Sequence, residues 1–198
     1  MQFFLFAVSY LLGAIPFGLL FGKMVGADVR KEGSRNIGAT NVSRVLGKKL
    51  GVLTLVCDLL KGGVAVLVAT LLMPDGVSKE LVVVGCGLLA VIGHMFSVYL
   101  GFSGGKGVAT GLGVFLFLAP WAVLISAGVF ISTVALTGFV STGSLLATAL
   151  LPLWLYLLGE SNVVVWGAVI LAILVWLKHH ENIGRLLRGQ EKSWKKKK

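Results

Sequence analysis

Residues 107–177 read GVATGLGVFLFLAPWAVLISAGVFISTVALTGFVSTGSLLATALLPLWLYLLGESNVVVWGAVILAILVWL and contain no Lys or Arg and one acidic residue, Glu160. Of the 198 residues in the chain, 57% are hydrophobic and 13% are charged, whereas an average soluble domain carries about 25% charged residues. A chain of this length cannot hide so much apolar surface inside itself, and disorder requires low hydrophobicity. The composition excludes a soluble globular domain and a disordered chain, and it indicates an integral membrane protein.

Three further apolar runs precede this stretch, and each is close to the roughly 20 residues that a transmembrane helix needs. They cover residues 3–21, 50–73 and 81–100. Helix breakers at Pro120, 137–138 and 159–162 separate 107–177 into four more segments. We expect these at 107–118, 121–136, 141–158 and 162–178. The sequence therefore predicts an all-α bundle of seven transmembrane helices, with five spans as the alternative.

The basic residues predict the orientation, because Lys and Arg are enriched on the cytoplasmic side of membranes. Of the 18 basic residues, seven lie in 23–49, eight in 178–198, and one is Lys106. We therefore place these segments in the cytoplasm, with the C-terminus, and the N-terminus outside. The net charge of +10 favours an anionic membrane surface or an anionic substrate over nucleic acid.

We expect one membrane-embedded domain over residues 1–198. Its cytoplasmic motif segments lie near 33–44, 101–110, 137–144 and 179–189. The first three precede helices that run from inside to outside, so unpaired N–H groups and the positive ends of helix dipoles should face the cytoplasm. The topology thus predicts an anion-binding cytoplasmic face.

The segment 33–44 reads GSRNIGATNVSR and combines small, hydroxyl, amide and guanidinium groups. Glycine allows the backbone to approach a ligand closely, and Arg binds phosphate in a bidentate manner. These groups predict a binding loop for an anionic ligand. A solvated basic loop is the alternative explanation.

The segment 93–110 reads GHMFSVYLGFSGGKGVAT and places Lys106 among glycines directly before a helix. It is not a Walker A loop, since Leu100 stands where that motif has Gly, and Gly107 where it has Ser or Thr. Free N–H groups, a helix N-terminus and one ammonium still predict phosphate binding. A flexible interfacial loop with a snorkelling Lys is the alternative, and we expect His94 to be structural.

The segment 179–191 reads HHENIGRLLRGQE and places His179 and Asn182 on one helical face. A basic amphipathic tail lying on anionic lipid is the alternative, and we accept it for 195–198. The hydroxyl-rich segment 137–144 includes Ser141, although such residues can also simply cap a helix.

The remaining polar residues limit the kinds of catalytic and metal site that the protein can form. Asp58 and Lys61, three residues apart in one span, should pair inside the bundle. Cys57 and Cys86 lie in apolar runs and are expected to be free thiols. The sequence has no zinc-type Cys/His spacing, no HExxH, no His followed five residues later by Asp, and no Gly-x-Ser-x-Gly. We expect no metal and no cofactor.

The runs GSRNIGATNVSR, GHMFSVYLGFSGGKGVAT and HHENIGRLLRG, in this order, resemble the three signature motifs of the bacterial acyl-phosphate-dependent glycerol-3-phosphate acyltransferases, the PlsY family. The resemblance covers essentially the whole chain. The sequence departs from the family pattern at Arg35, Ser97 and Ser103, where Gly, Pro and Lys are usual.

The resemblance implies transfer of a fatty acyl group from acyl phosphate to sn-glycerol 3-phosphate. The products are 1-acyl-sn-glycerol 3-phosphate (lysophosphatidic acid) and inorganic phosphate, the first step of bacterial phospholipid synthesis. It also implies a multi-pass protein of the bacterial inner membrane with a cytoplasmic active site. We expect a monomer that contacts membrane lipid and no nucleic acid.

Because no Ser–His–Asp set is evident, we expect direct attack without an acyl-enzyme, with a substrate phosphate favoured over His179 as the base. The expected catalytic residues are Lys106, His179, Asn182 and Ser141. The expected substrate-binding residues are Ser34, Arg35, Asn36, Gly38, Thr40, Asn41, Arg44, Gly104, Gly105, Gly107, Thr110 and Arg185. A transporter for a phosphorylated solute and a lipid-binding membrane scaffold are the alternative functions.

Overall fold

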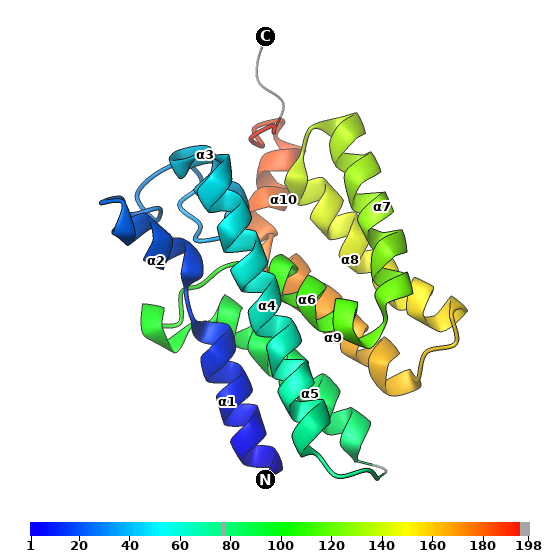
Figure 1. Cartoon of the computed structure of the whole chain (residues 1–198). Helices are drawn as coiled ribbons and strands as arrows, with labels where there is room; N and C mark the ends of the chain where they lie inside the picture. The colour runs from blue at the N-terminus through cyan, green and yellow to red at the C-terminus, as the bar shows by residue number, and fades with distance from the viewer. Residues whose placement is uncertain (77, 195–198) are drawn as a thin grey trace. The chain divides into compact units, whose positions relative to one another are not determined.

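The computed structural model describes residues 1–76 and 78–194, and every regular element within these two ranges is a helix. Figure 1 shows the path of the chain through them. The elements are α1 (Gln2–Ala14), α2 (Phe17–Met24), α3 (Ala39–Leu46), α4 (Lys48–Leu72), α5 (Lys79–Met95), the 3-10 helix η1 (Val98–Leu100), α6 (Val108–Leu118), α7 (Pro120–Thr137), α8 (Val140–Leu157), α9 (Asn162–Lys178) and α10 (His180–Leu187). The predicted all-α class is confirmed.

Among the described residues, five helical stretches are long and apolar enough to cross a bilayer. They are Gln2–Met24, Lys48–Leu72, Lys79–Leu100, Pro120–Thr137 and Val140–Leu157. α9 and α10, bent by 60°, form a sixth candidate if they are taken together. The 11 residues of α6 extend for only about 16 Å, roughly half the thickness of the hydrocarbon layer.

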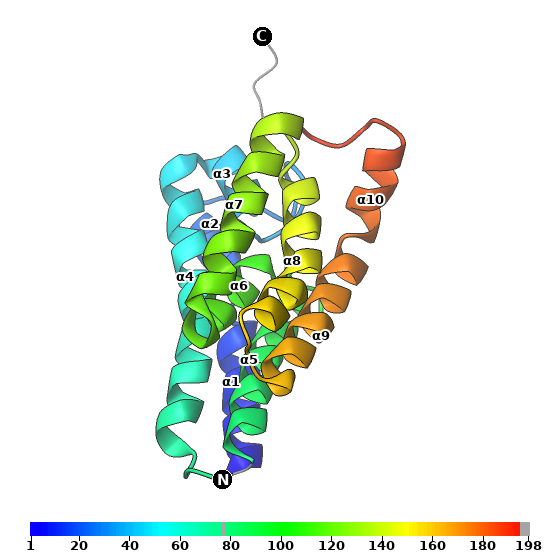
Figure 2. The ribbon, with the colours of Figure 1, turned by 90° about the vertical axis from the view of Figure 1, so that its right-hand side faces the viewer.

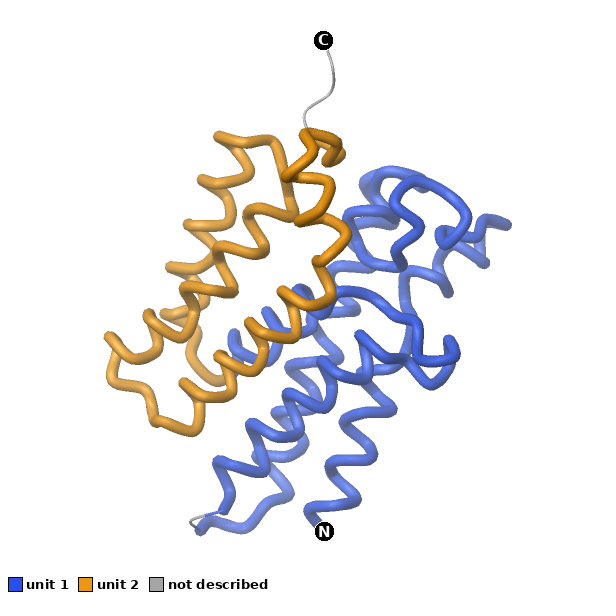
Figure 3. Tube along the Cα trace, turned by 180° about the vertical axis from the view of Figure 1, so that it is seen from behind, with its two compact units in different colours: residues 1–117 blue, residues 118–198 orange. Residues whose placement is uncertain are grey.

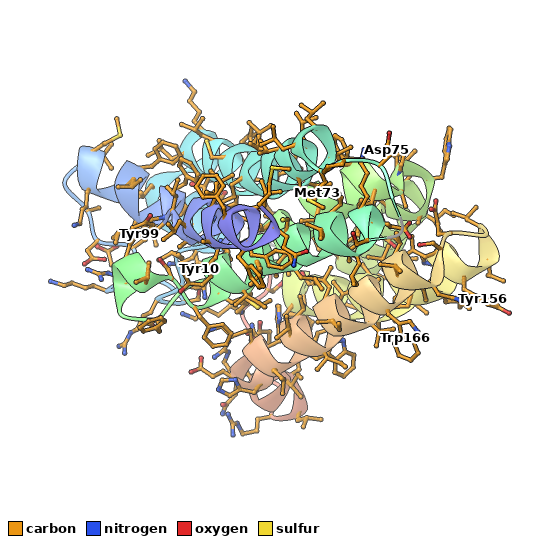
Figure 4. All side chains as sticks on the ribbon, turned by 90° about the horizontal axis from the view of Figure 1, so that it is seen from below. Tyr10, Met73, Asp75, Tyr99, Tyr156 and Trp166 are labelled. Carbon is orange, nitrogen blue, oxygen red and sulfur yellow. The ribbon has the colours of Figure 1, made fainter. Side chains whose placement is uncertain are left out.

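The outward side chains are those expected of a surface in contact with lipid. The sticks that project from the helices in Figure 4 are mostly carbon. Trp166 of α9 and Tyr156 of α8, both labelled there, are 65% and 71% exposed. Large apolar and aromatic side chains on the outside indicate a helical membrane protein, since water would not favour them.

The predicted helix breaks are confirmed, and each has a local cause. Pro120 begins α7, where its missing N–H would have had no partner in the helix. Gly138 ends α7 in the left-handed conformation with φ 79°. Ser161 caps α9 by accepting a hydrogen bond from the N–H of Val164 at 3.3 Å.

Two features differ from the prediction. The first apolar run is not one helix, because Pro16 separates α1 from α2 and proline cannot donate a backbone hydrogen bond. The polar segment 33–44 does not lead directly into a span either. It contains the start of α3, which ends at Gly47 with φ 92° before α4 begins.

The helices form two compact units, Met1–Phe117 and Leu118–Lys198, drawn in blue and orange in Figure 3. In the first unit, α1 packs along α5, and α4 packs against both α3 and α5. In the second unit, α7 packs on α8 and α8 on α9, as Figure 2 shows. Each unit is therefore a set of neighbouring helices, and in the first unit longer segments join α2 to α3 and α5 to α6.

Close backbone approach joins α1 to α5 in the first unit. A Cβ added to Gly93 of α5 would lie 2.2 Å from the carbonyl oxygen of Tyr10 in α1. The hydroxyl of the same Tyr10 donates to the carbonyl of Phe96 at 2.7 Å. Because lipid removes the hydrophobic drive between helices, such small-residue contacts supply much of the packing energy.

Replacing this glycine should destabilise the protein. Gly93→Ala is expected to cost about 1–3 kcal/mol, the usual range for overpacking a close contact. Gly128→Ala in α7 is the matched control, because an added Cβ there meets nothing within 4 Å. Cys57 is half-buried and Cys86 is buried in the folded chain, so thermal unfolding in detergent, followed with a dye that reacts with thiols as they become exposed, measures both. Equal unfolding temperatures would show that the α1–α5 contact is not close.

Candidate active site

The loop before α3 is built on a small apolar core of its own. This core contains Leu19, Val29, Ile37 and Val42, with Leu46, Leu50 and Leu100 packed against it. Because these side chains point inward, Ser34, Arg35 and Arg44 remain exposed. The core thus holds a polar surface made of the residues that the sequence predicts to bind substrate.

Asn41 fixes the path of this loop. Its side chain is buried, and its amide donates to the carbonyls of Val29 at 2.9 Å, Asn36 at 2.9 Å and Glu32 at 3.2 Å. Its Oδ1 accepts from the N–H of Ser34 at 2.7 Å. The polar atoms of Asn41 are therefore engaged with the backbone, and their effect is to hold the loop in shape.

The arginines of the loop differ in their surroundings. Arg30 forms an ion pair with Asp28 at 2.7 Å, and its hydrogen bonds hold the pKa of that carboxyl well below its usual range. Within residues 1–76 and 78–194, neither Arg35 nor Arg44 forms an ion pair with an acid. Arg35 has φ 59°, a conformation that costs an L-residue about 1–2 kcal/mol. A glycine at this position would adopt the same backbone conformation without that cost.

The glycine-rich loop before α6 folds back on the end of α5. The N–H of Gly105 donates to the carbonyl of His94 at 2.9 Å, and the N–H of Gly104 to that of Met95 at 3.2 Å. A Cβ on Gly105 would lie 2.1 Å from Nε2 of His94, so only glycine fits against the imidazole. Lys106 follows immediately and is partly exposed.

The first turn of α6 completes this loop. Gly107 has φ 78°, and α6 begins at the next residue. Thr110 is fully buried, and its hydroxyl oxygen has no hydrogen-bond partner among the described residues. The ammonium of Lys106 thus stands directly before a helix N-terminus, where anions are favoured.

In the second unit, three predicted site residues meet at one carboxylate, that of Glu191. Its Oε1 accepts from the hydroxyl of Ser141 at 2.8 Å and from the amide of Asn182 at 2.5 Å. Its Oε2 accepts from Nε of Arg185 at 2.7 Å. This Glu191 cluster joins α8, α10 and the segment that follows α10.

The Glu191 cluster influences the pKa of Glu191 and lies where the chain leaves α10. Burial alone would raise the pKa of Glu191, but the hydrogen bonds from Arg185, Asn182 and Ser141 lower it below the usual value of a glutamate. Beyond the cluster, the N–H of Trp194 donates to the carbonyl of Gly138 at 2.7 Å. The segment after α10 is therefore fastened to the turn between α7 and α8.

His179 lies at the bend between α9 and α10 and is buried. Its Nδ1 lies 2.8 Å from the carbonyl of Val175. Because a carbonyl can only accept, Nδ1 carries a proton, and in the neutral imidazole Nε2 then holds the lone pair. The imidazole must have this tautomer if Nε2 is to accept a proton from a hydroxyl group.

The comparisons with known proteins agree with the motifs. The family model described as Glycerol-3-phosphate acyltransferase matches residues 3–189. The chain belongs to the glycerol-3-phosphate acyltransferase family. It is 62% identical over 197 residues to a glycerol-3-phosphate acyltransferase of Desulfotalea psychrophila, covering 100% of both chains. It is 50% identical over 192 residues to one of Trichlorobacter lovleyi, covering 97% of both chains.

Solved structures support the same assignment. The crystal structure of PlsY, an integral membrane glycerol 3-phosphate acyltransferase, in its glycerol 3-phosphate form is similar with a TM-score of 0.92 and 40% identity. The match covers 98% of this chain and 96% of that chain. The lysophosphatidic acid form has a TM-score of 0.89 at the same identity and covers 97% of this chain and 94% of that chain. The predicted family is confirmed.

Two of the family motifs fold into defined local structures. The segment 33–44 folds around the side chain of Asn41. The glycines at 104 and 105 lie against His94. Glu191 was not predicted as a site residue. Its position at the end of the third motif is visible in the sequence, but only the fold shows that three donors share its carboxylate.

The Glu191 cluster should contribute stability that depends on pH. Because the pKa of Glu191 is lowered in the folded state, this stability is complete above the ordinary glutamate pKa of about 4.3. It is lost as the pH falls through the lower folded value. Glu191→Gln should reduce the stability at pH 7 by about 1–3 kcal/mol, and the difference from the native chain should shrink towards pH 3.

Glu181→Gln is the control, since Glu181 is exposed and lies 3.5 Å from the same Arg185. Thermal unfolding of the three proteins from pH 7 to pH 3 measures the effect. A difference between native chain and Glu191→Gln that stays constant with pH would contradict the ionised cluster.

Proposed function

We propose that this protein transfers a fatty acyl group from acyl phosphate to sn-glycerol 3-phosphate, which gives lysophosphatidic acid and inorganic phosphate. One observation carries the proposal. The PlsY structures that this chain resembles, with TM-scores of 0.92 and 0.89, are a glycerol 3-phosphate form and a lysophosphatidic acid form. These are the acceptor and the product of one acylation. The acyl phosphate donor is supported by the motifs, which contain groups for more than one phosphate.

The donor already contains a good leaving group, so the protein has mainly to position the reactants. The glycerol hydroxyl oxygen attacks the acyl carbonyl carbon, the bond from that carbon to the phosphate oxygen breaks, and its electrons leave with phosphate. The hydroxyl proton passes to a phosphate oxygen, so no acyl-enzyme forms. Cations and N–H groups stabilise the charge on the carbonyl oxygen and the leaving group.

The proposed roles follow the chemistry of each residue. Lys106 neutralises a phosphate, together with Arg44 and the polar groups of 33–44. The N–H groups of Gly104 and Gly105 already donate to carbonyls at the end of α5, so these two glycines let the loop pack closely and do not supply free donors. His179 and Asn182 orient the acceptor, and the hydrogen bond from Nδ1 of His179 to Val175 places the lone pair of the neutral imidazole on Nε2. Ser141 belongs to the same cluster as Asn182 through Glu191, and Arg185 balances that carboxylate.

We further propose a monomer in the bacterial inner membrane with seven passes, an external N-terminus and a cytoplasmic site. α6 is too short to span the bilayer by itself. Its pass therefore requires that the bilayer is locally thinned or that α6 is shielded from lipid by the protein. The basic segments 23–49 and 178–194 support the orientation.

Phosphate release tests the reaction directly. The purified protein in lipid should release inorganic phosphate from a long-chain acyl phosphate only when glycerol 3-phosphate is present, and should form lysophosphatidic acid in equal amount. Acyl-CoA should not replace the donor. Uptake of labelled glycerol 3-phosphate into liposomes without acyl phosphate would instead indicate a transporter, and acylated protein recovered from a single turnover would overturn direct attack.

Removing the ammonium of the glycine-rich loop should stop the reaction. Lys106→Ala is expected to lower kcat/KM by about 100-fold or more, the range for loss of a group that stabilises developing charge. Lys79→Ala is the matched control, because Lys79, the first residue of α5, pairs at 2.7 Å with Asp75 in the turn before that helix. Steady-state kinetics of both variants measure the effect. If Lys106→Ala keeps most of its activity, Lys106 is not part of the site.

A further inference from the structure

Three ionisable side chains lie buried together in the first unit, and the proposed reaction does not use them. They are Asp58 and Lys61 of α4 and His94 of α5. The side chains of Lys61 and Asp58 are 1% and 2% exposed and lie 2.8 Å apart. The pairing predicted from their spacing is confirmed. Charged groups inside a membrane are costly and are usually kept for function, so this cluster needs an explanation.

Lys61 has three polar neighbours. Its Nζ lies 2.8 Å from Oδ1 of Asp58, 2.9 Å from the carbonyl oxygen of Ile15 and 2.8 Å from Nδ1 of His94. It donates a hydrogen bond to the carbonyl of Ile15, since an ammonium has three protons and no acceptor. The contact with Asp58 is an ion pair that balances the charge, because Oδ1 of Asp58 has no hydrogen-bond partner among the described residues.

The distances around Nδ1 assign the tautomer of His94. Nδ1 lies 2.8 Å from Nζ of Lys61 and 3.6 Å from Oδ1 of Asp58, and the second distance is too long for a hydrogen bond. Because a charged Lys61 can only donate, Nδ1 then holds a lone pair, and the proton of the neutral imidazole lies on Nε2. The same Nε2 faces Gly105, where a Cβ would come within 2.1 Å of it. The imidazole N–H is thus presented to the glycine-rich loop, one residue before Lys106.

His94 holds this loop with its backbone as well as with its ring. Its carbonyl accepts from the N–H of Gly105 at 2.9 Å, and the carbonyl of Met95 accepts from Gly104 at 3.2 Å. The ring can stay against Gly105 only if its own orientation is fixed. Lys61 fixes it from the opposite side, through Nδ1.

We infer that Lys61 and His94 are positioning residues that set the geometry of the glycine-rich loop for phosphate. Lys61 fixes the imidazole as the Nε2–H tautomer, the imidazole holds the backbone at Gly105, and Asp58 supplies the balancing charge. The inference rests on the proposed function in one respect, that this loop binds a substrate phosphate. Disturbing the pair should therefore weaken substrate binding more than it slows the chemical step.

Two amide replacements separate the two nitrogens of the ring. In His94→Asn, the side-chain oxygen can take the place of Nδ1 and accept from Lys61, but nothing reaches Gly105. In His94→Gln, the side-chain N–H can take the place of the Nε2 donor. We expect His94→Asn to raise the KM for a phosphate substrate about tenfold with kcat changed less than threefold, and His94→Gln to restore most of the affinity.

Thermal unfolding of both variants is measured alongside the kinetics. If His94 were only structural, the two variants would lose stability without the expected difference in their KM values. The inference is wrong if His94→Asn has native KM values, or if the KM values of both variants change in proportion to their stability. In either result the native protein still releases phosphate, so the proposed function would stand.

A second measurement does not depend on activity. Nitrogen-15 NMR of labelled histidine in the full protein reports the tautomer, and the absence of one signal in His94→Asn identifies His94 among the three histidines of the chain. We expect a protonated Nε2 and an unprotonated Nδ1 near neutral pH. In the charge-matched double variant Asp58→Asn with Lys61→Met, this fixed tautomer should be lost. A proton on Nδ1 in the native chain, or an unchanged spectrum in the double variant, would overturn the inference.

Discussion

Hydrocarbon offers no hydrogen bonds, so every backbone N–H and C=O within it needs a partner from the chain. Helices meet this requirement except at their ends and breaks. The break at Pro16 leaves carbonyl groups at the end of α1 without helical partners. The carbonyl of Ala14 accepts from the hydroxyl of Ser97 at 2.6 Å, and that of Ile15 accepts from Lys61 at 2.9 Å. The break is therefore possible because side chains from α4 and from the turn after α5 complete it.

The same requirement shapes the polar segments. The loop before α3 has no regular pattern of backbone hydrogen bonds, and the side chain of Asn41 in α3 provides its backbone with partners. The segment after α10 is likewise held by Glu191 and by the hydrogen bond from Trp194 to Gly138. A reaction that depends on positioning needs loops of fixed shape, and these buried or half-buried side chains provide that fixation.

The prediction from sequence was most successful where neighbouring residues decide the outcome. Pro120 and Gly138 were predicted as helix boundaries, and each acts through its own backbone chemistry. The family assignment succeeded because three motifs in one order are specific. α3 was missed because its eight residues lie within a polar motif that was interpreted as a loop, although the helix is amphipathic. Its apolar face packs through Val42 onto the small core below the loop.

By itself, the sequence determined a helical membrane protein, the positions of its apolar segments and the polar motifs that carry the chemistry. These properties depend on local composition, which adds up over adjacent residues. Only the tertiary structure decided which polar groups share a partner. Lys61 meets the carbonyl of Ile15 across 46 residues, and Ser141 meets Glu191 across 50. A hydrogen bond depends on distances of a few ångströms between atoms, and the packing of the helices alone sets those distances.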